Sequence, residues 1–525
     1  MPEQALLVLE VKDELRYLFQ APGLEDVRGA GALLETLNRF TLPSLARQRD
    51  LQGAGIAGGG RQYVLTFAAP ELAQRYLREA RRIYRQRTVA AAVRGAAVAV
   101  QPEDLVLRFG AFLGRAKLAV EQEAPAAFTT VGTRGGAELR WCDRCLAFPA
   151  SHLRAGVLRC RACHNRRLHL ADQAERLALA GYQTSLADAG EEDLAARPVW
   201  ERFLRWVRDR GLVRSSDAAA DIGKIDRLRA PEEAAFAGDD GGTAIVVGQI
   251  NDLDRTLGVL NDSHRTLLAA ARVNTLLDDS LFEAAAAYCW RDVAQPLAWD
   301  PFVVGGDRFV AAFPSDRAAA VIARCLRSFE GQSAAAAEGR RLSLHVGVGF
   351  ASAGLPLSIG AMAAQRGLEA ARRQYVLASD GSARGAWRST VGLALAEGDA
   401  FAVVNAGELE RALAHARTLR RVGLDAVQLR PVAPAAVPGQ ARPAQLDAAA
   451  LARATGSMSD AQRRTLTTVL RDLGVIAAEA APADSRLLAA TAALIPYAGS
   501  FPVLARQSSS PEAEPSAGGV EMRSA

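Results

Sequence analysis

The sequence predicts an α+β protein in which one β-α-β-β-α-β unit occurs twice. Two glycine-rich hairpins, at residues 56–67 and 302–314, lie within the same order of apolar runs. Two matched cysteine pairs lie between these hairpins, and helical patterns follow the second one. Because 525 residues are too many for one hydrophobic core, we expect roughly three to four domains.

The first copy of the unit lies near the start of the chain. Residues 6–11 are an apolar run that predicts a strand, and residues 24–40 carry apolar side chains at helical spacing. The glycine hairpin at 56–67 comes next. Residues 70–85 then predict an amphipathic helix, and residues 89–100 predict a closing strand.

The second copy repeats this order. Residues 244–250 predict its first strand, and residues 302–314 predict its hairpin. The following helix is expected to be capped by Ser315 or Asp316, and a strand at 342–350 ends the unit. Two units of this kind correspond to two ferredoxin-like domains.

Four cysteines between the two copies have the spacing of a zinc ribbon. They form the pattern C-x₂-C…C-x₂-C and are Cys142, Cys145, Cys160 and Cys163. Two such pairs supply four thiolates for a closed tetrahedral zinc site. A disulfide framework is the first alternative, and the absence of a signal peptide argues against it. A redox pair is the second, and the presence of two matched pairs argues against it. His164 could replace one cysteine.

The predicted ribbon is also basic. It contains a single acid, Asp143, and seven arginines: Arg140, Arg144, Arg154, Arg159, Arg161, Arg166 and Arg167. Such a patch could follow a phosphate backbone. A solvated loop surface would give the same composition, so both interpretations stay open.

Composition places the chain among ordinary soluble proteins. Apolar residues make up 50% and charged residues 23%, and the net charge of +5 suggests an anionic partner such as nucleic acid or nucleotide. No apolar run reaches the roughly 18–20 residues that a membrane span requires. The first residues lack the basic flank of a signal peptide, so we expect a cytoplasmic protein.

These patterns predict a domain organisation. The expected parts are 1–101, the first ferredoxin-like domain; 102–170, a linker helix and the zinc ribbon; 171–240, a helical connector; 241–432, the second ferredoxin-like domain; 446–506, a C-terminal helical domain; and 507–525, a disordered tail.

The order of these parts resembles the large subunit of type III CRISPR effector complexes, a palm-domain family related to GGDEF cyclases. Residues 25–34, 142–150 and 303–313 look like its first-palm helix, its ribbon and its catalytic hairpin. The resemblance implies two palms, the second of which binds ATP and Mg²⁺ and makes cyclic oligoadenylates once target RNA is bound. It also implies crRNA, target RNA and other effector subunits as partners.

The catalytic hairpin departs from the family pattern at two positions. The family tip is Gly-Gly-Asp-Asp, and this chain has Gly305, Gly306, Asp307 and then Arg308. A further carboxylate ends the family's first strand, where this chain has Gln249. Two Mg²⁺ ions about 3.5–4 Å apart need several shared carboxylates, and an amide is a weaker ligand for a hard cation.

We therefore expect a degenerate site, in which Asp307 is the remaining catalytic acid. Asp252 or Asp254 could stand in for the missing carboxylate on the first strand. Arg308 adds a fixed positive charge and could contact a phosphate directly. The residues expected to bind nucleotide are Gly305, Gly306, Arg308, Arg372 and Arg373.

The leading hypothesis is a large-subunit-like scaffold of an RNA-guided type III-type effector, with a palm that is inactive or weakly active and binds nucleotide without turnover. An active cyclic oligoadenylate synthetase and a stand-alone palm-domain nucleotide sensor are the alternatives. The HD nuclease domain with which the family often begins needs histidines for its metal site. The first histidine here is His152, so we expect no such nuclease.

Overall fold

The structure is a computed structural model. It describes residues 3–59, 62–123, 140–169, 199–211, 242–251, 253–289, 299–352, 355–379, 388–395, 401–424, 458–472 and 485–495. The expected tail at 507–525 and most of the expected connector at 171–240 lie outside these residues.

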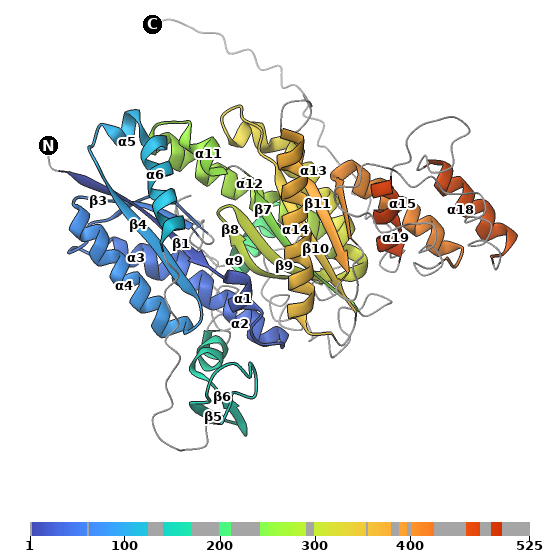
Figure 1. Ribbon diagram of the computed structural model, residues 1–525, viewed down its shortest axis with the longest axis horizontal. Helices are drawn as coiled ribbons and strands as arrows, with labels where there is room; N and C mark the ends of the chain where they lie inside the picture. Colours follow the sequence, from blue (N-terminus) through green and yellow to red (C-terminus); the bar gives the residue numbers. More distant parts are fainter. Residues whose placement is uncertain are drawn as a thin grey trace, which may run out of the picture.

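Residues 4–100, called the first unit here, form a four-stranded antiparallel sheet with the strand order β2-β3-β1-β4 (Figure 1). Its elements are β1 (Gln4–Lys12), α1 (Glu14–Leu18), α2 (Leu24–Glu35), the π-helical segment η1 (Thr36–Thr41), α3 (Leu42–Ala46), β2 (Ala54–Gly59), β3 (Gln62–Phe67), α4 (Pro70–Thr88) and β4 (Ala92–Val100). The closing strand starts three residues later than the sequence predicts. Val89 has a φ of 65° and ends α4 instead.

The first sheet is covered on both faces because successive side chains of β1 point in opposite directions. Leu7 belongs to the main core, which it shares with α4. Leu6 and Val8 belong to a smaller core under α6 (Phe109–Gln122), which follows α5 (Asp104–Leu107). This linker helix therefore packs on the first sheet.

Residues 243–351, called the second unit here, have the same element order and the corresponding strand order, β10-β7-β9-β8. The elements are β7 (Thr243–Ile250), α11 (Leu253–Gly258), α12 (Ser263–Cys289), β8 (Asp300–Gly305), β9 (Arg308–Pro314), α13 (Ser315–Ala336) and β10 (Leu344–Ala351). Two further strands, which the sequence did not reveal, extend this sheet: β11 (Thr390–Leu395) and β12 (Phe401–Asn405).

The expected cap of α13 is wrong. Pro314 is the N-cap residue, and no side chain makes a capping hydrogen bond. Ser315 and Asp316 already lie inside the helix, and both are buried.

The two units pack against each other in a reciprocal manner. Helix α2 of the first unit lies along β8, the edge strand of the second sheet, and α12 of the second unit lies along β2, the edge strand of the first. A Cβ atom on Gly31 would lie 2.4 Å from the carbonyl oxygen of Phe302, so only glycine permits this approach of α2. Each unit thus covers an exposed edge of the other.

Helix α14 (Leu357–Ser379) covers the second sheet at very short range. A Cβ on Gly347 would lie 1.8 Å from the carbonyl oxygen of Ala364, and one on Gly349 would lie 2.0 Å from that of Gly360. The glycines of β10 thus leave room for the helix backbone itself. They place α14 directly behind the strand that pairs with β7.

The described C-terminal helices belong to the same body. Helix α15 (Ala406–Arg421) begins with a capping box formed by Asn405 and Glu408. Helix α18 (Asp460–Asp472) packs against α15, and α19 (Ser485–Leu494) packs against both α15 and β12. Among the described residues, no helix is long and apolar enough to cross a membrane.

Candidate functional site

The hairpin between β8 and β9 has the tight turn that its glycines predict. Gly305 has a φ of 143° and Gly306 a φ of 67°, both in the region that favours glycine. Gly305 pairs with Arg308, so the loop contains two residues. The Gly306 N–H donates to the side-chain oxygen of Asn274 on α12, at 2.6 Å. Residues 305–308 are called the hairpin tip below.

Asp307 is bound by residues of the neighbouring strand. Its Oδ2 accepts a hydrogen bond from Gln249 Nε2 at 2.9 Å, and its carbonyl oxygen accepts one from the Ile250 N–H at 2.7 Å. The other side of the Gln249 amide, Oε1, accepts from Arg372 Nη1 at 3.3 Å. The structure thus brings Gln249, Asp307 and Arg372 together in a hydrogen-bonded chain.

Arg308 does not face solvent, although the sequence suggested that it could contact a phosphate. Its side chain is 9% exposed and its Nε lies 3.8 Å from Glu14 Oε2, at the start of α1 in the first unit. Its Nη2 donates to Gln365 Oε1 on α14 at 3.2 Å. Gln365 in turn donates to Glu369 at 2.9 Å. A guanidinium therefore occupies the acidic position of the family pattern and is paired within the chain.

No cluster of acids surrounds the tip within the described part of the chain. There, the one group of three or more His, Cys, Asp or Glu side chains able to share a metal ion is the cysteine cluster. Asp252 lies outside the described residues, and so does the side chain of Asp254. Arg373 is exposed and donates to the Glu369 carbonyl of its own helix at 3.4 Å.

Three residues that lie at the tip were not predicted from the sequence: Glu14, Asn274 and Gln365. Each reaches the tip from a helix far away in the chain, and none belongs to a motif. The strand register alone links part of this site without distant helices, because Gln249 stands opposite Arg308 on the adjacent strand. No pattern in the sequence indicates that α1 of the first unit would face the second hairpin.

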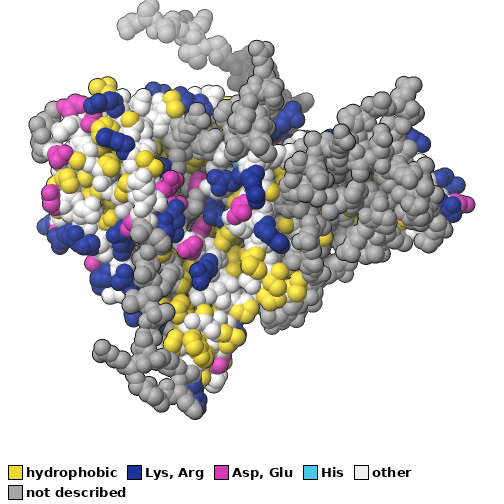
Figure 2. Space-filling view, in the orientation of Figure 1, with side chains coloured by type: hydrophobic (Ala, Val, Ile, Leu, Met, Phe, Trp, Pro, Cys, Tyr) yellow, Lys and Arg dark blue, Asp and Glu magenta, His cyan; other side chains and the backbone are white. Residues whose placement is uncertain are grey.

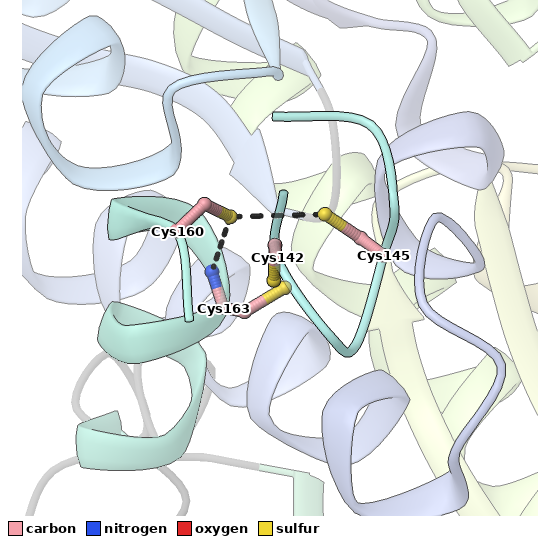
Figure 3. Close-up of side chains that lie close together, drawn as sticks. All are labelled: Cys142, Cys145, Cys160 and Cys163. Atoms are coloured by element: carbon pink, nitrogen blue, oxygen red, sulfur yellow. Dashed lines mark hydrogen bonds between the residues drawn. The ribbon is translucent and has the colours of Figure 1, made fainter. Parts of the chain in front are cut away.

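The four predicted zinc ligands converge (Figure 3). The Sγ atoms of Cys142, Cys145, Cys160 and Cys163 all lie within 4.8 Å of one another, and those of Cys145 and Cys160 are 3.7 Å apart. Hydrogen bonds among the clustered thiols lower the pKa of Cys145 and raise the pKa of Cys160 to about 12. The set fits a tetrahedral metal ion such as zinc.

His164 is not part of this cluster. Its ring stacks on that of His152, with 3.9 Å between the ring centroids and 6° between the planes. The histidines of the ribbon therefore pack on each other beside the short strands β5 (His152–Arg154) and β6 (Val157–Arg159). Four thiolates remain as the candidate ligand set.

Several ribbon arginines bind to the first unit. Arg144 Nε donates to Asp26 on α2 at 2.9 Å, and Arg167 pairs with Glu25. Arg166 is fully buried, donates to the Tyr17 carbonyl at 2.6 Å and lies 4.3 Å from the centroid of the Tyr17 ring. These three arginines fix the ribbon to the fold, which weakens the interpretation of all seven as a phosphate-binding patch.

Comparisons with known proteins identify the fold. No family model matches the sequence, and no curated protein matches it. A Csm1–Csm4 cassette in complex with pppApApA matches with a TM-score of 0.51 and 13% identity, over 95% of this chain and 69% of that one. A Csm1–Csm4 cassette in complex with cA3 matches with a TM-score of 0.45 and 13% identity, over 71% of this chain and 53% of that one.

The chain thus spans about half the length of that cA3-bound relative in the alignment. At 13% identity, the similarity to the pppApApA-bound cassette shows a shared fold. The predicted resemblance to the large subunit of type III CRISPR effector complexes is confirmed at this level, as a mixed α+β architecture.

Proposed function

We propose that this chain is a large-subunit-like scaffold of an RNA-guided type III-type CRISPR antiviral effector. The fold shared with a Csm1–Csm4 cassette over 95% of the chain supports this proposal. We interpret both β-α-β-β-α-β units as ferredoxin-like palm domains, because they share element order and strand order. The partners would be crRNA, target RNA and other effector subunits, in the cytoplasm.

The second palm is proposed to lack efficient turnover. The observation that carries this is Arg308, whose buried guanidinium is paired with Glu14 where the family pattern has an acid. Gln249, on the adjacent strand, offers an amide that is already bonded to Asp307. A single carboxylate cannot offset the repulsion of two Mg²⁺ ions, so two-metal catalysis is disfavoured.

Nucleotide binding without turnover remains part of the proposal. Gly305, Gly306, Arg372 and Arg373 are the expected contacts, and Arg372 and Arg373 are exposed. Arg308 would have to leave Glu14 and Gln365 to take part. A Csm1–Csm4 cassette with the similar fold was solved in complex with pppApApA, which makes ATP the first ligand to test.

Turnover is tested with radiolabelled ATP, Mg²⁺ or Mn²⁺ and target RNA, using the chain and its co-purified complex. We expect no more product than in a reaction without protein. Abundant cyclic or linear oligoadenylate from the unmodified protein would contradict the degenerate-site proposal. The variant Gln249→Asp restores one acidic position of the family pattern and leaves the Arg308–Glu14 pair in place. It is expected to bind Mn²⁺ more tightly than the parent chain.

We propose that the ribbon holds one structural zinc ion through Cys142, Cys145, Cys160 and Cys163. Elemental analysis of the purified chain should give about one zinc per chain, and Cys142→Ser should lower this value to near zero. Cys289→Ser is the matched control, since Cys289 is buried in the main core. Well under one zinc in the parent chain would exclude the site.

The ribbon and the first unit are the proposed docking surfaces. Hydrophobic side chains gather toward the lower end of the described surface in Figure 2. Within the ribbon, Trp141, Leu146 and Leu153 are exposed. Positive and negative side chains are mixed over the rest of this face. Co-purification of the tagged chain from its native cell tests the proposal: crRNA and effector subunits should accompany it. Recovery of the chain without RNA would instead favour a stand-alone nucleotide sensor.

A further inference from the structure

Several polar groups of the hairpin tip are hydrogen-bonded within the chain. The Gly306 N–H is bound by Asn274, and the Asp307 carbonyl oxygen by the Ile250 N–H. The Asp307 carboxylate accepts from Gln249, whose amide oxygen accepts from Arg372. A ligand that binds the tip through these groups would therefore have to replace existing hydrogen bonds.

Arg308 joins three parts of the structure at this point. It belongs to β9, it lies beside Glu14 of α1 in the first unit, and it donates to Gln365 of α14. The Glu14 side chain is 2% exposed and that of Arg308 is 9% exposed. Glu14 is held there by the backbone, because Asp13 adopts a left-handed conformation between β1 and α1.

A buried pair of this kind resists separation. Guanidinium does not lose its proton in proteins, so Arg308 carries its charge at every ordinary pH. Removing one member of a buried ion pair leaves the other charge uncompensated in a medium of low polarity, which is strongly destabilising. If the hairpin moved away from α1, the two buried charges would be separated at the same cost, unless water entered to solvate them.

We propose that Arg308 is a clamp between the two units that holds the hairpin tip against α1. Glu14 is its partner in the first unit, and Gln365 fixes its position from α14. Where the family pattern has an acid that would bind a metal cation, this chain has the permanently charged Arg308 guanidinium. The inference concerns the same hairpin as the proposed function, but it requires neither RNA nor a partner subunit.

Amide hydrogen exchange of the full chain, measured by mass spectrometry without RNA or nucleotide, tests the clamp. Glu14→Gln removes one charge and keeps the shape of the side chain. Arg308→Met removes the other. In both variants we expect exchange to become at least about 10-fold faster in two segments together, residues 304–310 and residues 13–18. The double variant should exchange no faster than the faster single variant, because the pair acts as one unit.

Arg265→Gln is the control, because Arg265 forms an exposed ion pair with Glu338 within the second unit. Exchange at the tip should be unchanged in this variant. Unchanged exchange at the tip in both clamp variants, or faster exchange confined to the mutated element, would overturn the proposal. Should Arg308→Met fail to fold, Arg308→Lys retains a charge, and a smaller acceleration in the same two segments is expected. Loss of RNA or ATP binding would bear on the proposed function and not on this experiment.

Discussion

The two units of this protein share one topology and differ in the positions of their acidic residues. In register, Glu10 of β1 stands opposite Gln62 of β3, as Gln249 of β7 stands opposite Arg308 of β9. The first unit therefore has its acid on the strand, and the second unit has its acid, Asp307, in the hairpin. Neither has acids at both places, so neither repeats the arrangement of shared carboxylates that a site with two metal ions requires.

The sheets also differ in burial. Every residue of β8, β9 and β10 is buried, whereas only some residues of β4 in the first unit are. The second sheet, covered by α12 and α13 on one side and by α14 on the other, is the centre of the molecule. The first unit covers an edge of this sheet and carries the ribbon. We therefore expect the second unit to tolerate substitution less well than the first.

Gly347→Val is the substitution that should harm the second unit most. The new side chain would begin 1.8 Å from the Ala364 carbonyl oxygen, where neither backbone can move without separating α14 from β10. We expect a loss of about 4 kcal/mol or more in the free energy of unfolding, or no folded protein. Urea denaturation and the yield of soluble protein measure this effect. A variant as stable as the parent chain would show that α14 is not held at this distance.

The sequence predicted the strands and helices of both units because their hydrophobic periodicity is local. It also predicted the cysteine cluster, since two knuckles of fixed spacing need little tertiary information. It did not predict β11, which joins the sheet by non-local parallel pairing with β10 across α14, or β12, which pairs with β11. The Arg308–Glu14 pair could not be predicted from the sequence either, because it depends on how the two units dock.

Arg28→Ala tests the contact between the units. Arg28 on α2 pairs with Asp300 on β8, whose carboxylate is 2% exposed. Burial raises the pKa of Asp300, and Arg28 opposes this effect. Without the guanidinium, the buried carboxylate loses its counter-charge, so we expect a destabilisation of about 3 kcal/mol. Thermal unfolding measures it.

Arg265→Ala is the comparison for Arg28→Ala, since the exposed pair with Glu338 lies within one unit. Its cost should be about 0–1 kcal/mol. Equal costs for the two arginines would show that the buried contact between the units adds nothing to stability.

His345 gives the second unit a pH dependence of its own. The ring is fully buried beside Thr390, 2.6 Å from its hydroxyl, and burial lowers the pKa of His345 to about 4. The unfolded chain binds the proton at its ordinary pKa of about 6.5, before the folded one does. The stability contributed by His345 is thus complete above pH 6.5 and is lost as pH falls toward 4.

Between pH 7 and pH 4.5 this loss should amount to about 2 kcal/mol. It is measured as the difference in urea midpoint between the parent chain and His345→Gln at each pH. The comparison with the variant is needed because burial raises the pKa of Glu35 and Asp300, which acts in the opposite direction. An equal pH dependence in both proteins would contradict the assignment to His345.

Gly114→Ala in α6, the helix that packs on the first sheet, should give the smallest effect, and of the opposite sign. Gly114 lies inside α6, and a Cβ there would meet no atom within 4 Å. Alanine removes backbone freedom from the unfolded chain, so we expect a gain of about 0.5–1 kcal/mol. Thermal unfolding that shows a loss would mean that another surface packs on α6 at this point. The two glycines thus differ in role: Gly347 leaves space for a neighbouring backbone, and no such space is required at Gly114.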